Sequence, residues 1–174
     1  MAAKLGRRIL IVGSGGAGKS TLARLLGERL SLPVTHLDKE FWNHGWVETP
    51  KDEWRKKQQE LLSKPEWILD GNFGSSLELR LERADTVIFL DFNRFVCLCS
   101  IFKRRLANAG KTRPDMAEGC PEKIDFAALR WIWQFRSKSR PVILEKVSKC
   151  KVELIAIKSR KKLKEFVNEI GRAS

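Results

Sequence analysis

The chain has 174 residues, of which 43% are hydrophobic, enough for one globular domain with a full-sized core. Its four cysteines show neither the paired C-x-x-C spacing of a zinc site nor the even framework of a small secreted scaffold, which favours a cytoplasmic protein. The first apolar run stops at Gly13, too short for a signal peptide, and no later run is long enough to span a membrane. We therefore expect no membrane partner, and the composition leaves the oligomeric state open.

The net charge of +13 is unevenly distributed. Residues 1–90 hold 14 Lys or Arg against 12 Asp or Glu, a net charge of +2, whereas residues 91–174 hold 20 against 9, a net charge of +11. Such an excess fits a solvated surface, a polyanion partner, or a group of arginines around bound phosphates. Charge alone does not separate these three arrangements.

Strand and helix patterns alternate along the chain. Apolar strands are predicted at residues 7–13, 33–38, 66–71, 85–91 and 151–159, and helices at 19–30, 49–62, 93–106 and 125–147, with a last helix after the fifth strand. Thr49 is predicted as an N-cap with Pro50 at the first helical position, and the helix at 125–147 is predicted to bend or restart near Pro141. Strands separated by helices predict an α/β fold with a parallel sheet, helices on both faces and ligands at the carboxyl ends of the strands.

The sharpest motif is the segment 13–20, "GSGGAGKS", which matches G-x-x-x-x-G-K-[ST] and lies between a predicted strand and a predicted helix. Its glycines let backbone N–H groups turn toward an anion, and the helix adds the positive end of its dipole. Lys19 is predicted to reach the β- and γ-phosphates of ATP, and Ser20 to bind Mg²⁺. The predicted nucleotide-binding residues are Gly13, Ser14, Gly15, Gly16, Ala17, Gly18, Lys19, Ser20 and Thr21.

A second magnesium ligand is expected at the end of a neighbouring strand. Asp70 closes the run "EWILD" and is followed by a glycine that permits a sharp turn, so it is the first candidate. Asp91 is the fallback, although a role as the cap of the helix that begins near Asn93 is favoured for it.

Several segments carry a family resemblance: "HLDKEFWNHGW", "WILDGNFG", "ADTVIFLDFNR" and "RPDMAEGCPEK". Together with the P-loop and the helix around "FKRRL", they resemble the adenylate-kinase-like P-loop kinases and, more narrowly, the bacterial FlaR-like proteins, called DNA-topology-modulation proteins. The resemblance covers residues 13 to about 140. It implies a three-layer P-loop NTPase sandwich with five parallel strands in the order 2-3-1-4-5. It also implies one kinase domain over residues 1–174, with an acceptor-binding segment at about 38–65 and a small lid at about 104–125.

The resemblance also suggests roles for basic residues of the second half. In this group of kinases the arginines of the lid close on the transferring phosphoryl group, which here implies Arg104, Arg113 and Arg136. Arg140 is expected on the same helical face as Arg136, four residues away. Arg105 and Arg140 are less secure candidates, because either could be a solvent-facing neighbour. Lys158 and Ser159 are implied to border the adenine.

The acceptor side departs from the nucleoside monophosphate kinases. Those enzymes follow the metal strand with D-G-F-P-R, whose arginine grips the acceptor phosphate, whereas this chain has "DGNFG" at residues 70–74. Asp38 ends the second predicted strand, where relatives that phosphorylate a hydroxyl, such as shikimate and uridine kinases, carry an aspartate. It could accept the proton of the attacking hydroxyl or orient that group. Alternatively, Asp38 is an N-cap or an ion-pair partner of Lys39 or Arg80.

Aromatic side chains crowd the segment that follows Asp38: Phe41, Trp42, Trp46 and Trp54. They could form the wall of a nucleoside pocket or pack the interior of a small lobe, and the pattern leaves both open. His36 and His44 are predicted to be structural or surface residues, because phosphoryl transfer of this type needs no imidazole.

Together these features predict a cytoplasmic, Mg-ATP-dependent kinase that transfers a phosphoryl group to a small-molecule acceptor. A hydroxyl of a nucleoside-like or other metabolite is favoured over a monophosphate. The alternatives are a nucleoside monophosphate (adenylate-type) kinase and a nucleotide-binding DNA topology modulator. Binding to DNA draws on the family name and on the basic residues 158–164, but no helix-turn-helix, zinc-finger or RNA-binding signature is present, so it is not favoured.

Overall fold

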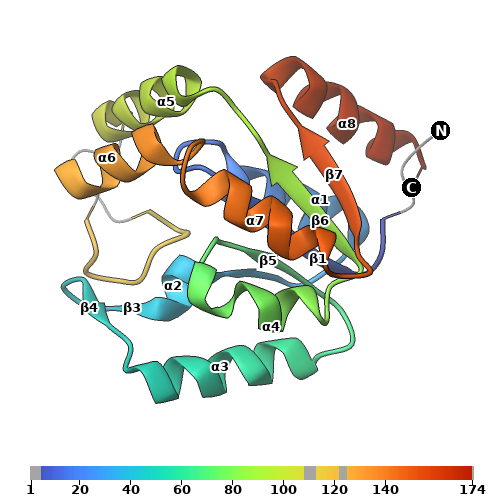
Figure 1. Cartoon of the computed structure of the whole chain (residues 1–174), viewed down its shortest axis with the longest axis horizontal. Helices are drawn as coiled ribbons and strands as arrows, with labels where there is room; N and C mark the ends of the chain where they lie inside the picture. Colours follow the sequence, from blue (N-terminus) through green and yellow to red (C-terminus); the bar gives the residue numbers. More distant parts are fainter. Residues whose placement is uncertain (1–4, 108–112, 122–124, 174) are drawn as a thin grey trace.

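The computed structural model of the chain describes residues 5–107, 113–121 and 125–173, and its centre is a five-stranded parallel sheet. The strands are β1 (Arg8–Gly13), β2 (Val34–His36), β5 (Trp67–Asp70), β6 (Thr86–Leu90) and β7 (Glu153–Ile157). Their spatial order is β2-β5-β1-β6-β7 (Figure 1). Counted along the chain this is 2-3-1-4-5, so the predicted α/β fold and strand order are confirmed.

Helices cover both faces of the sheet. The longer ones are α1 (Lys19–Leu30), α3 (Lys51–Ser63), α5 (Arg94–Ala107), α6 (Phe126–Gln134), α7 (Ser139–Ser148) and α8 (Arg160–Ala173). The short elements are α2 (Leu37–Phe41), β3 (Trp42–Asn43), β4 (Val47–Glu48), the 3₁₀ turn η1 (Gly74–Ser76) and α4 (Leu77–Leu81). The sequence predicted the long helices and missed these short elements, which lack a sustained helical or alternating pattern.

The sheet divides the core into two layers, because successive side chains of a strand point to opposite faces. Ile9 and Ile11 of β1 belong to the layer packed by α1 and α8, together with Leu26 and Ile170. Leu10 and Val12 belong to the layer packed by α4 and α7. The central residues of β1, β5 and β6 are apolar because both faces of these strands are covered.

One helix boundary differs from the prediction, and the restart predicted near Pro141 is confirmed. Helix α3 starts at Lys51, and Thr49 is not its cap: the Thr49 hydroxyl donates to the carbonyl oxygen of Phe41 at 2.6 Å and thereby holds the end of the β3–β4 hairpin. The predicted helix at 125–147 is two helices separated by residues 135–138. Pro141 lies in the first turn of α7, where its missing N–H needs no partner, so the restart precedes it.

Membrane-spanning helices were sought among the described residues. No helix in this part of the chain combines the length and the apolar character that a bilayer crossing needs.

Candidate active site

The loop between β1 and α1 forms an anion cradle at the carboxyl edge of the sheet. Gly16 and Gly18 have φ angles of 76° and 94°, a conformation that side chains rarely adopt. A Cβ atom on Gly16 would lie 2.3 Å from the carbonyl oxygen of Cys97, whereas the space beside Gly18 is open. The loop is therefore pressed against α5 on one side and open on the other.

Lys19 is folded over this loop. Its Nζ donates to the carbonyl oxygens of Gly13 and Ser14, each at 3.1 Å. Burial lowers the pKa of Lys19, while the negative charges of Asp38 and Asp70 oppose that shift. The cation is thus held over the cradle by two carbonyl groups that a bound phosphate can replace.

Ser20, Asp70 and His36 form a chain of hydrogen bonds across three elements. The Ser20 hydroxyl donates to Asp70 Oδ2 at 2.7 Å, and His36 Nδ1 lies 2.6 Å from Asp70 Oδ1. Burial would lower the pKa of His36, but the hydrogen bond and charge of Asp70 outweigh it and raise the pKa. Asp70 is almost fully buried, so both of its oxygens are fixed at the end of β5.

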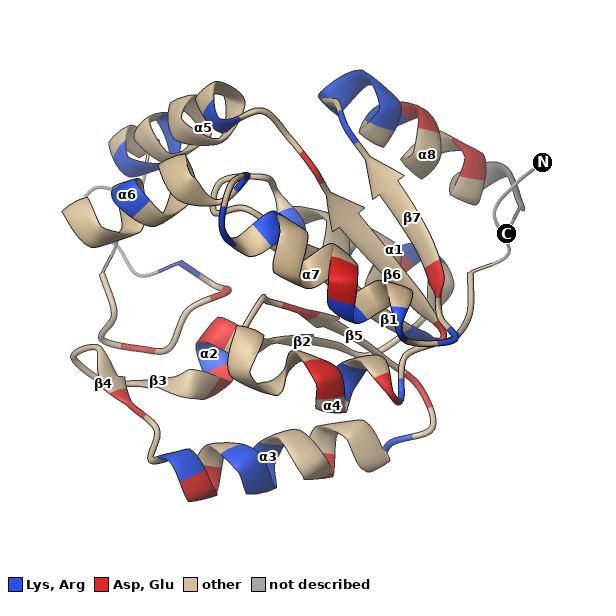
Figure 2. Ribbon diagram, in the orientation of Figure 1, with Lys and Arg blue, Asp and Glu red and all other residues tan. Residues whose placement is uncertain are grey.

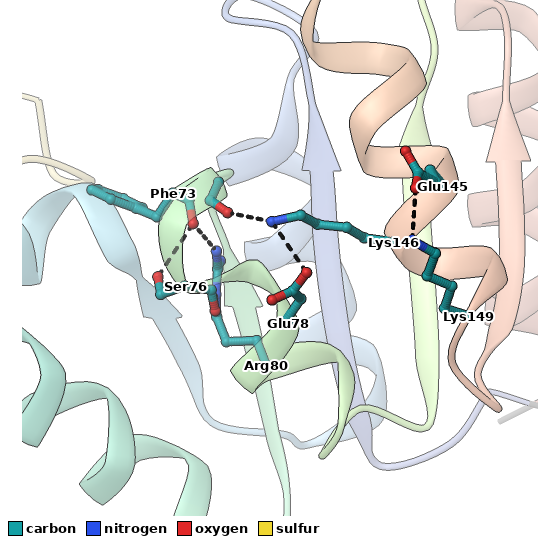
Figure 3. A network of polar contacts seen from close by, with 8 residues as sticks. Phe73, Ser76, Glu78, Arg80, Glu145, Lys146 and Lys149 are labelled. Atoms are coloured by element: carbon teal, nitrogen blue, oxygen red, sulfur yellow. Dashed lines mark hydrogen bonds and ion pairs between the residues drawn. The ribbon is translucent and has the colours of Figure 1, made fainter.

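Two further side chains hold the loop after β5. The amide of Asn72 accepts a hydrogen bond from Gly13 N at 3.0 Å and donates to Gly13 O at 2.7 Å. Arg80 is fully buried and donates to the carbonyl oxygens of Gly71 and Asn72. It also donates to the carbonyl oxygen of Phe73 (Figure 3). Burial lowers the pKa of Arg80 to about 9. The loop that carries Asp70 is thereby tied directly to the start of the P-loop.

A cavity of about 610 Å³ opens beside the cradle. Its lining comprises Gly15, Gly16, Gly18, Lys19, Ser20, Thr21, Arg24, Asp38, Ser100, Arg104, Arg113, Pro114, Asp115 and Arg160.

Two of the three predicted lid arginines, Arg104 and Arg113, lie at this cavity. The third, Arg136, lies in the turn between α6 and α7, exposed and outside this lining. The predicted lid at 104–125 includes residues 108–112 and 122–124, which lie outside the described part of the chain.

Asp91 and Arg140 have roles that the sequence did not predict. Arg140 Nε and Nη2 donate to the Asp91 carboxylate at 2.9 to 3.0 Å, so each neutralises the other. The helix cap expected of Asp91 is wrong, because Asn93 Oδ1 accepts the hydrogen bond from the N–H of Phe95. The expected shared face of Arg136 and Arg140 is also wrong, because the helix is interrupted between them.

Asp38 lines the same cavity as the nucleotide cradle, and its negative charge acts on Lys19. Strand β2 ends at His36, two residues earlier than predicted, and Asp38 stands in the first turn of α2. The proposed partners of Asp38 are engaged elsewhere: Lys39 donates to the carbonyl oxygen of Pro114, and Arg80 to the carbonyl groups after β5. Although its side chain reaches the open cavity, enclosure by protein raises the pKa of Asp38; Lys19 opposes this shift, and Asp70 adds to it.

The aromatic residues of the acceptor segment pack on one another. Phe41 makes edge contacts with Trp42, Trp54 and Phe73 at ring-centroid distances of 5.0, 5.3 and 4.9 Å. Trp46 lies edge-on to Trp42 at 5.4 Å. None of these five rings belongs to the described lining of the cavity. Of the two readings that the sequence left open, the packed interior of a small lobe fits this arrangement.

Residues 113–121 are docked on the hairpin that follows α2. Gly45 N donates to Gly119 O at 3.2 Å, and Cys120 Sγ donates to Asn43 O at 3.3 Å. Gly119 has a φ angle of 74°, and a Cβ there would lie 2.1 Å from His44. This contact places Arg113 and Asp115, paired at 3.4 Å, beside Asp38.

The sequence did not predict that the following residues belong to the site: Arg24, His36, Asn72, Asp115 and Arg160. Arg24 lies one turn after Ser20 on α1, so helical spacing alone could have indicated it. His36 pairs in register with Asp70 across β2 and β5, a neighbourhood that only the strand order reveals. Arg160 lies directly after Lys158 and Ser159, the residues expected beside the adenine, which are not in the described lining.

The residues present fit Mg-ATP. The cradle has positive-φ glycines, an open side at Gly18 and a lysine bound to carbonyl groups, which suits a polyphosphate. Ser20 and Asp70 offer a hydroxyl and a carboxylate at one point, the oxygen ligands that Mg²⁺ prefers. Arg24, Arg104 and Arg160 add positive charge around the same cavity.

Comparison with known proteins gives structural matches but no sequence match. No protein-family model and no curated protein sequence matches the chain. The FlaR-like assignment therefore stays a prediction, and nothing in the comparisons supports a role in DNA topology.

Several solved kinases share the fold over nearly the whole chain. Shikimate kinase from Acinetobacter baumannii in complex with shikimate matches with a TM-score of 0.59 and 18% identity over 98% of this chain and 93% of that one. Shikimate kinase from Aquifex aeolicus matches with a TM-score of 0.53 and 22% identity over 95% and 94%. A gluconokinase from Sinorhizobium meliloti matches with a TM-score of 0.53 and 17% identity over 94% and 89%. The chain thus has the α/β fold of small P-loop kinases.

Proposed function

We propose that the protein transfers the γ-phosphoryl group of Mg-ATP to a hydroxyl group of a small molecule. The observation that carries this proposal is the position of Asp38, which lines the same cavity as Lys19 and Ser20 of the P-loop. A carboxylate opposite a phosphate cradle is the arrangement that a hydroxyl acceptor requires and a phosphate acceptor does not. The shared fold with shikimate kinase and gluconokinase points the same way.

The roles of the residues follow from their positions. Mg-ATP, when bound, supplies the transferable phosphoryl group and the charge of the metal. The P-loop amides and Lys19 bind the phosphates, and Ser20 and Asp70 hold the metal. Asp38 orients the acceptor hydroxyl and accepts its proton, a task that its raised pKa favours because the carboxylate becomes a stronger base.

Arg104 and Arg113 supply positive charge where the phosphoryl group would pass between donor and acceptor. Such charge stabilises a transition state whose negative charge is spread over the phosphoryl oxygens. Arg136 lies outside this cavity, and we assign it no part in the transfer.

The lining of the cavity indicates a polar, non-aromatic acceptor. Asp38, Asp115 and Arg113 offer hydrogen-bond acceptors and a charged donor, which suit a compound with several hydroxyl groups. The aromatic rings that could have stacked on a base are packed in the lobe instead. Hydroxylated metabolites are therefore favoured over nucleosides, and nucleosides over nucleoside monophosphates.

The test is a panel of acceptors incubated with ATP, Mg²⁺ and the protein, with mass detection of phosphorylated products. The panel holds hydroxy acids including shikimate and gluconate, polyols, nucleosides and nucleoside monophosphates. Lys19→Met protein, purified identically, controls for contaminating kinases. A phosphate ester formed on a hydroxyl by the wild type alone supports the proposal. Exclusive formation of diphosphates from monophosphates would replace it with the adenylate-type alternative.

A further inference from the structure

The outer face of α5 carries large apolar side chains that touch little of the protein. Phe95, Phe102 and Leu106 are 61%, 48% and 82% exposed, and Cys99 is exposed between them. Their spacing of four, three and four residues puts them on one face of the helix. That face lies opposite Cys97 and Ile101, which are buried against the P-loop side.

Helix α6 extends this face. Phe126 and Trp133 are 87% and 47% exposed. Trp133 lies edge-on to Phe95, with a ring-centroid distance of 5.8 Å. The end of α6 thus meets the start of α5, and the two helices lie side by side (Figure 1). We call Phe95, Cys99, Phe102, Leu106, Phe126 and Trp133 the α5–α6 outer face.

All charged residues of helices α5 and α6 are basic. Neither α5 nor α6 contains Asp or Glu, and their basic residues are Arg94, Lys103, Arg104, Arg105 and Arg130 (Figure 2). Arg94 lies over the ring of Trp133 at 4.7 Å, so positive charge and apolar surface meet directly. The only carboxylate in the immediate flanks that the structure describes is Asp125, which caps α6 through the N–H of Ala127.

Shape and charge together identify the occupant of this face. A second copy of the chain would bring two basic rims together, so charge disfavours self-association. The most exposed side chains, Phe126 and Leu106, protrude from the helices and so suit a deformable surface. Phenylalanine, leucine and tryptophan beside arginine and lysine are the composition of helices that lie in the headgroup region of a bilayer.

We propose that the α5–α6 outer face binds the surface of an anionic lipid bilayer. The apolar side chains enter the boundary between headgroups and acyl chains, while Lys103 and Arg130 extend toward lipid phosphates. The proposal replaces the expectation of no membrane partner, which rested on the lack of a spanning segment, because peripheral attachment needs none. It also goes beyond the proposed kinase activity, because the face lies on the side of α5 that faces away from the phosphate cavity.

Flotation of the full chain with vesicles tests the proposal. We expect binding to phosphatidylcholine vesicles that contain phosphatidylglycerol, little binding to pure phosphatidylcholine, and loss of binding as salt is raised. The double variant F102S/L106S should lower the affinity by about tenfold or more, because each change removes an inserted apolar side chain. The matched control V47S/L154S, which alters exposed apolar residues elsewhere, should bind as the wild type does.

A second pair of variants separates this face from the overall charge of +13. K103Q/R130Q removes two charges beside the face, and K162Q/K164Q removes two from α8. A larger loss with the first pair supports the proposal, and an equal loss with both pairs overturns it. Thermal unfolding of each variant checks that it is folded, and neither measurement depends on whether the protein is a kinase.

Self-association through the α5–α6 outer face, the alternative to lipid binding, can also be measured. Sedimentation equilibrium without lipid should give the mass of a monomer. A dimer that forms as salt is raised and is lost in F102S/L106S would assign the face to a second copy and overturn the bilayer proposal. A lack of binding to anionic vesicles at low salt would overturn it directly.

Discussion

The two ends of the cavity are built in different ways. The glycine loop and the lysine of the nucleotide end come from one continuous stretch, residues 13–21, in which a strand, a loop and a helix follow each other. The acceptor end is assembled from α2 and residues 113–121, which are far apart in sequence and meet through the Gly45–Gly119 and Asn43–Cys120 hydrogen bonds. A local motif therefore forms the proposed phosphate site, while long-range packing determines what faces it.

The largest effect is expected at the nucleotide end, from Lys19→Met. Loss of this cation should lower kcat by about 10³-fold, because a preorganised charge at the transferring group contributes up to roughly 4 kcal/mol. The control Lys162→Met alters a lysine of α8 outside the described lining of the cavity. Steady-state kinetics with circular dichroism would measure both, and a folded Lys19→Met protein with near-normal kcat would contradict the assignment.

Asp38→Asn tests the acceptor end by the same assay. The amide cannot accept the hydroxyl proton, so kcat should fall by about 10²- to 10³-fold. Affinity for ATP should stay close to the wild-type value in calorimetric titration, since Asp38 is not part of the P-loop segment that binds the phosphates. A variant that loses ATP binding and keeps kcat would place Asp38 with the nucleotide and refute its role.

Gly119→Ala probes the docking of residues 113–121. The added Cβ would strain a residue with φ of 74° and collide with His44, so the segment should detach from the hairpin. We expect KM for the acceptor to rise by about tenfold with little change in ATP affinity, because Arg113 and Asp115 lose their fixed positions. Gly45→Ala is the comparison: it also has a positive φ, of 74°, but the space beside it is open. An equal effect of the two variants would mean that strain, and not docking, is responsible.

The smallest effect is a shift in pH dependence. Enclosure by the surrounding protein raises the pKa of Asp38; the positive charge of Lys19 opposes this shift, and the negative charges of Asp70 and Asp115 add to it. Because activity needs the ionised carboxylate, kcat should fall as the pH drops through this raised pKa. Asp115→Asn removes one like charge and should move the acid limb to lower pH, whereas the distant Glu145→Gln should leave it in place. A shift to higher pH in Asp115→Asn would contradict the assignment.

The difference between the two ends also explains what the sequence could predict. The P-loop, the Asp70 position and the long helices follow from local patterns, and the resemblance supplied the strand order. His36 was dismissed because its importance depends on the register of β2 against β5. Asp91 and Arg140 were assigned separate roles because their pairing joins two segments 49 residues apart.

The break between α6 and α7 could be placed only approximately. Pro141 indicates a restart, but a proline is tolerated throughout the first turn of a helix, so several starting points fit. Because the break was placed only approximately, Arg136 was expected on the face of a helix, whereas it lies in an exposed turn.

The most direct test of the central claim is a comparison of products from the acceptor panel with wild-type and Asp38→Asn protein, under Mg-ATP, by mass spectrometry. We predict that the wild type forms a phosphate ester on a hydroxyl group and that Asp38→Asn forms it at least about 10²-fold more slowly, at unchanged ATP affinity. Equal product from both proteins, or product only on the phosphate of a nucleoside monophosphate, would contradict the claim that Asp38 and the P-loop form the site of a hydroxyl kinase.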